Sequence, residues 1–347
     1  MNGLKKALKW MGLLLGPVLA FNITFLCANG MGDETDSNKI VQSQNLSGAE
    51  SLAKSKYTVL VLGRDDASGL TDVLLIVSFD TESKAVSVLQ IPRDTYAEFT
   101  SAAYRKINGA CDVLDGGRSV ADFLEDNLGV VIDRYISVDL DAVGKIVDIL
   151  GGVEIDVPFD MIYNDPYQGL SIDIRKGRQT LNGDRAKQFV RYRSGYTRGD
   201  LDRLDAQKLF LSALIKKAAE ESNAFSIVEI AGTLLQNADT DISYEYCFEM
   251  IKAMGIPEMK NISFVTLPGG DIQGSSGAWY YVMNRQAAYC VIKENFSVEL
   301  QENKFDPERK FTSYVRKGFN DIYEARSGYE PKIYYADDMS GVEKMIS

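Results

Sequence analysis

The residues best suited to chemistry form a basic segment within an acidic chain. The 347 residues include 38 Lys and Arg against 49 Asp and Glu, a net charge of −11. Between Arg175 and Arg203, nine basic residues stand against three acidic ones, a local charge of +6. Each guanidinium presents a planar fork of N–H donors that binds phosphate oxygens in pairs. The segment therefore predicts an anion site, with a solvated basic surface as the alternative.

The spacing within this segment favours a diphosphate as the anion. If the tripeptide from Arg191 to Arg193 is extended, both guanidinium groups point to the same side of the chain. Asp200, Arg203 and Gln207 succeed one another at intervals of three and four residues, so they share one face of a helix. The N-terminal end of a helix attracts phosphate because its N–H groups carry a partial positive charge.

Two aspartates near the first apolar runs predict a metal site. Asp65 closely follows the first run and Asp72 opens the second. Their oxygens suit a hard cation, and a phosphate substrate favours Mg²⁺, which binds one or two carboxylates together with phosphate and water. An acidic hairpin in solvent is the alternative interpretation.

Further polar residues come after the third apolar run. Arg93 and Asp94 stand directly after it, and Lys106 lies in a later loop. Arg93 can join an anion site, or it can form an ordinary salt bridge with an aspartate. The alternative interpretation is that Lys106 is part of an ordinary loop.

Composition excludes several other kinds of chemistry. The chain has no histidine, which rules out imidazole bases, Ser-His and Cys-His nucleophile pairs and His-ligated zinc. The net negative charge argues against nucleic acid as a partner. Cys111, Cys247 and Cys290 show no C-x-x-C spacing and imply no disulfide framework, although one bridge remains open.

The elements that must position these residues alternate between strands and helices. Near-continuous apolar runs predict interior strands at 57–62, 73–79 and 86–91, and further strands are expected at 135–138, 153–157, 262–267 and 332–335. Apolar residues at helical spacing predict helices over 139–150 and 202–221, the first capped by Asp139 and stopped by Gly151. We expect a single α/β domain over 56–296, an α-β-α layered domain with a central mixed β-sheet.

The N-terminal region predicts a membrane anchor. Lysines occur in the tail 1–9, and the uncharged stretch 10–32 is long enough to cross about 30 Å of hydrocarbon as a helix. The positive-inside rule predicts a single-pass protein of the cell membrane with a cytoplasmic N-terminus and an extracellular domain. A cleavable signal peptide is the alternative. A polar linker is expected over 33–55, and residues 297–347 form a C-terminal extension that is peripheral or partly mobile.

Eight short motifs occur in the order seen in the LytR-CpsA-Psr family, which this sequence resembles over about 57–220. They are Gly63-x-Asp65, Thr71-Asp72, Ile91-Pro92-Arg93-Asp94, Lys106-x-Asn108, Gly151-Gly152-Val153-Glu154, Lys176-Gly177-x-Gln179-x-Leu181-x-Gly183, Arg191-x-Arg193 and Gly199-Asp200-x-x-Arg203-x-x-x-Gln207. Each motif alone is weak, but their common order is specific. Family members often carry Arg two residues before the second metal-binding Asp, and this chain has Leu70 there.

The resemblance implies a ligase that moves a glycan from a polyprenyl diphosphate carrier onto peptidoglycan with Mg²⁺. It implies that Asp65 and Asp72 hold the metal. The diphosphate would be bound by Arg93, Arg191, Arg193 and Arg203, with Lys106, Asp200 and Gln207 in support. We hypothesise that a sugar hydroxyl attacks the glycan-linked phosphate while Asp94 or Asp200 takes its proton.

Two alternative functions share diphosphate binding with this ligase and differ in the next step. With water as the nucleophile, the same site would act as a polyprenyl diphosphate phosphatase. A membrane-tethered protein that only binds lipid-linked glycans, or regulates envelope assembly, would catalyse neither reaction, and Leu70 favours this alternative because it makes the site less cationic.

Overall fold

The computed structural model describes residues 54–64, 69–97, 105–166, 169–221, 233, 238–254, 257–273, 277–296, 298–301 and 332–346. The predicted membrane span at 10–32, the tail before it and nearly all of the predicted linker lie outside these residues, as does Asp65. Among the helices in the described ranges, none is long and apolar enough to cross a membrane.

A seven-stranded mixed sheet forms the centre of the fold. Its order is β13-β10-β3-β2-β1-β4-β9. The strands are β1 (Lys56–Arg64), β2 (Thr71–Asp80), β3 (Ala85–Ile91), β4 (Arg134–Asp139), β9 (Ala238–Thr240), β10 (Ile262–Thr266) and β13 (Tyr334–Tyr335). β2 pairs antiparallel with both β1 and β3, whereas β4 runs parallel to β1 and β10 parallel to β3. The three apolar runs near the start of the folded part are therefore the interior strands that the sequence predicts.

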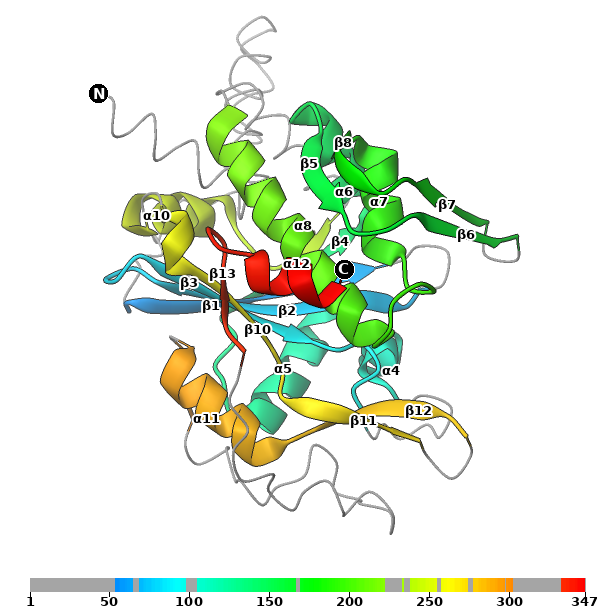
Figure 1. Cartoon of the computed structure of the whole chain (residues 1–347). Helices are drawn as coiled ribbons and strands as arrows, with labels where there is room; N and C mark the ends of the chain where they lie inside the picture. Colours follow the sequence, from blue (N-terminus) through cyan, green and yellow to red (C-terminus); the bar gives the residue numbers. More distant parts are fainter. Residues whose placement is uncertain are drawn as a thin grey trace, which may run out of the picture.

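Helices cover both faces of this sheet (Figure 1). Successive side chains of a strand point to opposite faces, so Val59 joins one buried cluster and Leu60 the other. The first cluster includes buried residues of α6 (Leu140–Ile149), α7 (Gly183–Arg191), α8 (Asp200–Glu221), α10 (Tyr244–Met254) and α12 (Ser340–Ile346). The second includes residues of α4 (Ala110–Leu114), α5 (Gly117–Leu128) and α11 (Arg285–Asn295). The observed architecture is the layered α/β domain with a mixed sheet that we expected.

Local signals set the limits of α6 as the sequence predicts. The Asp139 side chain accepts a hydrogen bond from the backbone N–H of Asp141 at 2.7 Å, which caps the helix. After the helix, Gly151 and Gly152 adopt φ values of +75° and +97°, and glycine adopts these angles at no steric cost. The next strand, β5 (Val153–Val157), pairs with β8 (Gly177–Leu181) outside the central sheet.

Two further hairpins project beyond the sheet (Figure 1). One consists of β6 (Met161–Asp165) and β7 (Leu170–Ile174), and the other of β11 (Gly269–Gln273) and β12 (Trp279–Met283). Short 3₁₀ helices occur at Ile107–Gly109 and Met259–Asn261. Cys111 and Cys290 carry free thiols, and the side chain of Cys247 is not among those described.

Candidate active site

A cavity of about 670 Å³ lies where the C-terminal end of β3 meets the loop between α7 and α8. Its lining comes from segments far apart in the sequence. The residues are Leu70, Asp72, Arg93, Asp94, Lys106, Asn108, Tyr163, Leu170, Arg191, Arg193, Ser194, Tyr196, Gly199 and Arg203. The volume is typical of a small-molecule site.

The cavity is cationic although the chain is acidic. Five of the predicted phosphate-binding residues line it: Arg93, Lys106, Arg191, Arg193 and Arg203. Two carboxylates, Asp72 and Asp94, are also present, so the lining carries a formal charge of +3. A concave site with this excess of positive charge attracts polyanions such as a diphosphate.

Arg191 and Arg193 both line the cavity, and Tyr192 between them is extended as the sequence suggests, although Arg191 itself is still helical. Arg191 is the last residue of α7, and Tyr192 leaves the helix with φ −61° and ψ 137°. Tyr192 is buried, with its ring 5.9 Å from that of Phe159 and 5.6 Å from that of Tyr196. The buried tyrosine anchors the chain in the core while the arginines on either side line the cavity.

Asp200 holds two of the arginines in place. It begins α8, as its predicted position near the N-terminal end of a helix requires. One carboxylate oxygen lies 2.7 Å from Nη2 of Arg203 and 3.6 Å from Nε of Arg93. Both Asp200 oxygens are buried, and Asp200 does not line the cavity. The geometry thus gives Asp200 a positioning role towards the guanidinium groups.

The environment of these arginines favours a bound anion. Nη1 of Arg93 donates a hydrogen bond to Asp72 at 2.6 Å, and the nearby Asp72 and Asp200 carboxylates raise the pKa of Arg93 despite its burial. Burial lowers the pKa of Arg203. The Asp200 carboxylate raises this pKa, whereas the positive charge of Arg93 lowers it further. The buried Nε atoms of both arginines have no hydrogen-bond partner among the described residues. Buried donors of this kind are stabilised when a ligand oxygen reaches them.

Gln207 lies on the same face of α8 but outside the cavity. Its side-chain oxygen accepts a hydrogen bond from Nε2 of Gln90 at 3.0 Å, and its nitrogen donates to the carbonyl oxygen of Val190 at 3.2 Å. Gln207 therefore ties α8 to β3 and to the end of α7, next to Arg191. Its contribution to the cavity is indirect.

Asp94 and Lys106 form a pair at the cavity wall. Nζ of Lys106 donates to Asp94 at 2.9 Å and lies 5.8 Å from the ring centroid of Tyr280. Both side chains line the cavity, so Asp94 has the access to a substrate that Asp200 lacks.

The predicted metal site is described only in part. Asp65 lies outside the described residues, whereas Asp72 lines the cavity beside Arg93. Within the described ranges, no group of three or more His, Cys, Asp or Glu residues could hold a metal ion. Asp72 is a hard oxygen ligand at a cavity suited to phosphate, which fits Mg²⁺ bound jointly by protein and substrate oxygens.

The β6–β7 hairpin contributes a part of the lining that no sequence motif predicted. Tyr163 and Leu170 are on the two strands of this hairpin and line the cavity. Strand β6 lacks an alternation of apolar and polar residues, because its neighbouring residues Ile162 and Tyr163 are both exposed. Strand β7 does alternate, with Ile172 and Ile174 buried between exposed polar residues, and this was the signal that the sequence offered. Leu70 also lines the cavity, so the position often occupied by Arg in the family is an apolar part of its wall.

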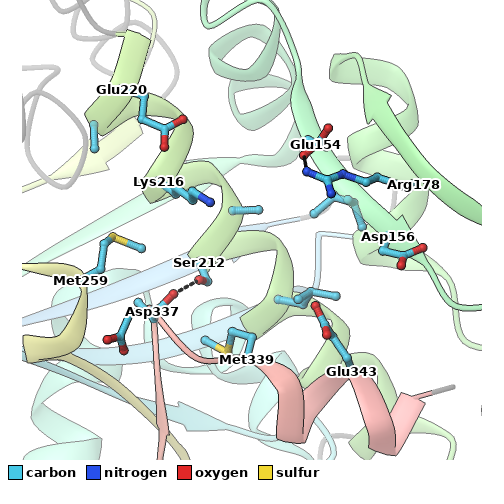
Figure 2. Close-up of a pocket in the computed structure, with 15 residues that line it drawn as sticks. Glu154, Asp156, Arg178, Ser212, Lys216, Glu220, Met259, Asp337, Met339 and Glu343 are labelled. Carbon is cyan, nitrogen blue, oxygen red and sulfur yellow. Dashed lines mark hydrogen bonds and ion pairs between the residues drawn. The ribbon is translucent and has the colours of Figure 1, made fainter.

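A second cavity, of about 560 Å³, has a different character (Figure 2). It lies mainly beside the C-terminal half of α8, between β5, β8 and α12. Its charged lining residues are Glu154, Asp156, Arg178, Lys216, Glu220, Asp337 and Glu343. Arg178 is paired with Glu154 at 2.6 Å, as Figure 2 shows. The excess of carboxylates makes this cavity unsuitable for a diphosphate.

Comparison with known proteins identifies relatives of the whole domain. The LytR_cpsA_psr family matches residues 24–296 of this chain. The "polyisoprenyl-teichoic acid–peptidoglycan teichoic acid transferase TagV" of Bacillus subtilis is 30% identical over 241 residues, which are 66% of this chain and 61% of that protein. The transferase of the same description named TagU, from Bacillus cereus, is 29% identical over 287 residues, 80% of this chain and 92% of that protein. The crystal structure of B. subtilis TagV matches with a TM-score of 0.57 and 27% identity, covering 71% of this chain and 99% of that chain.

Proposed function

Since this chain belongs to the LytR-CpsA-Psr family, we propose that it transfers a glycopolymer from a polyprenyl diphosphate carrier to peptidoglycan. The observation that carries this proposal is the convergence of Arg93, Lys106, Arg191, Arg193 and Arg203 on one cavity. The relatives TagV and TagU, named as transferases from polyisoprenyl-teichoic acid to peptidoglycan, support both substrate classes.

The proposed reaction is an attack by an acceptor hydroxyl on the glycan-linked phosphorus. A new P–O bond forms to the acceptor, the bridging P–O bond breaks, and polyprenyl phosphate leaves with the bridging oxygen. Arg93, Arg191 and Arg203 bind the phosphate oxygens and stabilise the charge that develops on them. Asp94 takes the hydroxyl proton, because its carboxylate lines the cavity while both oxygens of Asp200 are buried.

We further propose that Asp65 and Asp72 hold Mg²⁺. Bound there, the ion would neutralise charge on the diphosphate. Support comes from the position of Asp72 in the cavity wall beside Arg93.

The proposed location is the outer face of the cell membrane. The stretch 10–32 anchors the chain as a single-pass helix, and the tail 1–9 stays in the cytoplasm. The domain over 56–296 then works outside the membrane, where it meets the lipid carrier and the peptidoglycan acceptor.

Reconstitution of the full chain tests the proposal. The protein is incubated in vesicles with a polyprenyl diphosphate-linked oligosaccharide, peptidoglycan and Mg²⁺, and the products are analysed by mass spectrometry. The expected product is peptidoglycan that carries the oligosaccharide through a phosphodiester, together with polyprenyl phosphate. Free oligosaccharide phosphate and polyprenyl phosphate without modified peptidoglycan would instead indicate a phosphatase. Donor binding without any of these products would indicate a non-catalytic binder.

A further inference from the structure

The β11–β12 hairpin, which is hydrogen-bonded to the segment that carries Asp94, exposes a tryptophan. Trp279 is 56% exposed, the highest value among the large exposed hydrophobic side chains of the described residues. Single exposed apolar residues are common on protein surfaces. This residue differs from them in the polar side chains that share its face and in the attachment of its hairpin to the active site.

The register of the hairpin groups Trp279 with two polar residues. Trp279 is directly opposite Gln273, and Asp271 is two residues from Gln273 along β11. Residues opposite one another, and residues two apart on one strand, share a face of a sheet. Asp271, Gln273 and Trp279 are all exposed, so this face presents a carboxylate, an amide and an indole ring together.

Backbone hydrogen bonds fix the hairpin to the segment that carries Asp94. The N–H of Tyr281 donates to the carbonyl oxygen of Asp94 at 2.8 Å, and the N–H of Tyr96 donates to that of Tyr281 at 2.7 Å. The ring of Tyr280 packs edge-on against that of Tyr96, with centroids 5.4 Å apart. The hairpin is thus attached to the segment that carries Asp94, which lines the cavity, although none of the described hairpin residues lines it.

Asp271 lies directly opposite Tyr281, the residue whose N–H donates to the carbonyl oxygen of Asp94. Partial burial and the neighbouring carboxylates of Asp200 and Asp94 raise the pKa of Asp271, while Arg193 acts in the opposite direction. The row from Trp279 to Asp271 therefore leads along the hairpin towards the groups proposed to perform the transfer.

We propose that Asp271, Gln273 and Trp279 bind the saccharide of the acceptor strand. This inference rests on the proposed function and adds the acceptor site to it. The C–H face of a pyranose ring is apolar and stacks on an indole, while sugar hydroxyls donate to a carboxylate and accept from an amide. A neutral, hydroxyl-rich chain fits this face, whereas the anionic donor is drawn to the arginines and repelled by Asp271.

Tryptophan fluorescence tests the binding step without any donor. The chain contains two tryptophans, Trp10 and Trp279, so Trp10→Phe leaves Trp279 as the single indole. The full-length variant is titrated in detergent with a soluble tetrasaccharide of β-1,4-linked N-acetylglucosamine. A saturable blue shift of the emission is expected, since the sugar removes water from the indole. Unchanged emission at millimolar sugar would refute the inference.

Kinetics test the same surface during transfer. Trp279→Ala should raise the KM for soluble peptidoglycan fragments about tenfold or more, with the KM for the lipid-linked donor and the melting temperature unchanged. Tyr335→Ala provides a matched control, because Tyr335 is an aromatic residue 47% exposed on the edge strand β13. Its acceptor KM should equal that of the parent protein.

The outcomes separate this inference from the proposed function. Normal transfer with an unchanged acceptor KM in Trp279→Ala would contradict the acceptor site alone. A rise in the KM for the donor instead of the acceptor would contradict it as well. A saturable blue shift in a protein that transfers nothing would support the saccharide site and contradict the ligase activity.

Discussion

Arg93 contacts carboxylates on two sides, Asp72 at 2.6 Å and Asp200 at 3.6 Å. These contacts orient the guanidinium at the cavity before any substrate arrives. Such preorganisation matters because donors fixed in advance stabilise a developing charge without the cost of reorientation. The contribution of Arg93 to stabilising the developing charge therefore depends on the orientation of its guanidinium as well as on its positive charge.

We predict that Arg93→Ala lowers kcat/KM for transfer from the lipid-linked donor about 100- to 1,000-fold, the usual cost of losing a preorganised donor in a transition state. Arg93→Lys should recover little, since an ammonium lacks the planar fork. Arg178→Ala is the control, because Arg178 is exposed and paired with Glu154 at the other cavity. Near-normal turnover by Arg93→Ala would contradict the role assigned to Arg93.

Asp94 and Asp200 should respond differently to the same substitution. Asp200→Asn weakens a buried contact with two arginines, so the free energy of unfolding should fall by about 3 kcal/mol. Asp94→Asn removes a partly exposed pair with Lys106 and should cost less than about 1 kcal/mol while lowering kcat. Urea unfolding and steady-state kinetics of both variants measure the two effects. The assignment of Asp94 as the base fails if only Asp200→Asn lowers kcat.

At the scale of elements, α8 supplies cavity residues at its N-terminal end and anchors itself to the sheet further along. Lys208 is buried, and its Nζ donates to Asp205 and to the Thr266 hydroxyl, both at 2.6 Å. Thr266 belongs to β10, so this contact and that of Gln207 with Gln90 tie α8 to two strands. The helix is thereby held in the position that brings Arg203 into the cavity.

Because of Lys208, the free energy of unfolding should depend on pH in the alkaline range. Burial lowers its pKa below the ordinary 10.5 despite the nearby Asp205. Between the folded pKa and 10.5, the unfolded chain binds more protons, so the contribution of Lys208 to stability rises with pH. The free energy of unfolding of the parent protein, measured in urea from about pH 7 to about pH 10, should increase relative to that of Lys208→Met. A difference that stays constant or falls over this range would contradict the lowered pKa.

At the scale of the whole molecule, the proposed function requires a chain of net charge −11 to bind an anionic lipid carrier. The positive lining of one cavity makes this possible locally, while the remaining surface repels the substrate. Leu70 in the wall removes one cationic position of the family pattern. The proposed Mg²⁺ would accordingly have more of the diphosphate charge to neutralise.

We therefore predict that EDTA abolishes transfer and that added Mg²⁺ restores it. The melting temperature without substrate should change by less than about 1 °C, because the fold is held by its two buried clusters. The blue shift of Trp279 with the tetrasaccharide should also persist in EDTA. Full activity after exhaustive chelation would contradict the proposed metal site.

Local patterns in the sequence were sufficient to predict several elements. The runs at 57–62, 73–79 and 86–91 predicted interior strands because burial on both faces demands continuous apolarity. Asp139 was predicted to cap a helix, and its side chain caps the N-terminus of α6. The interval from Asp200 to Gln207 predicted one helical face, which α8 presents. In each case, residues close together in the sequence determine the local structure, so the prediction needed no knowledge of distant contacts.

The sequence by itself thus determined the types of most elements, the absence of histidine chemistry and a set of cationic residues suited to phosphate. Tertiary structure alone decided that Arg93, Lys106 and Arg203 share one cavity, and that Asp200 is buried while Asp94 is accessible. It also brought Trp279 towards the site through contacts between Asp94 and Tyr281. These features depend on pairings between segments far apart in the chain, which no local periodicity encodes.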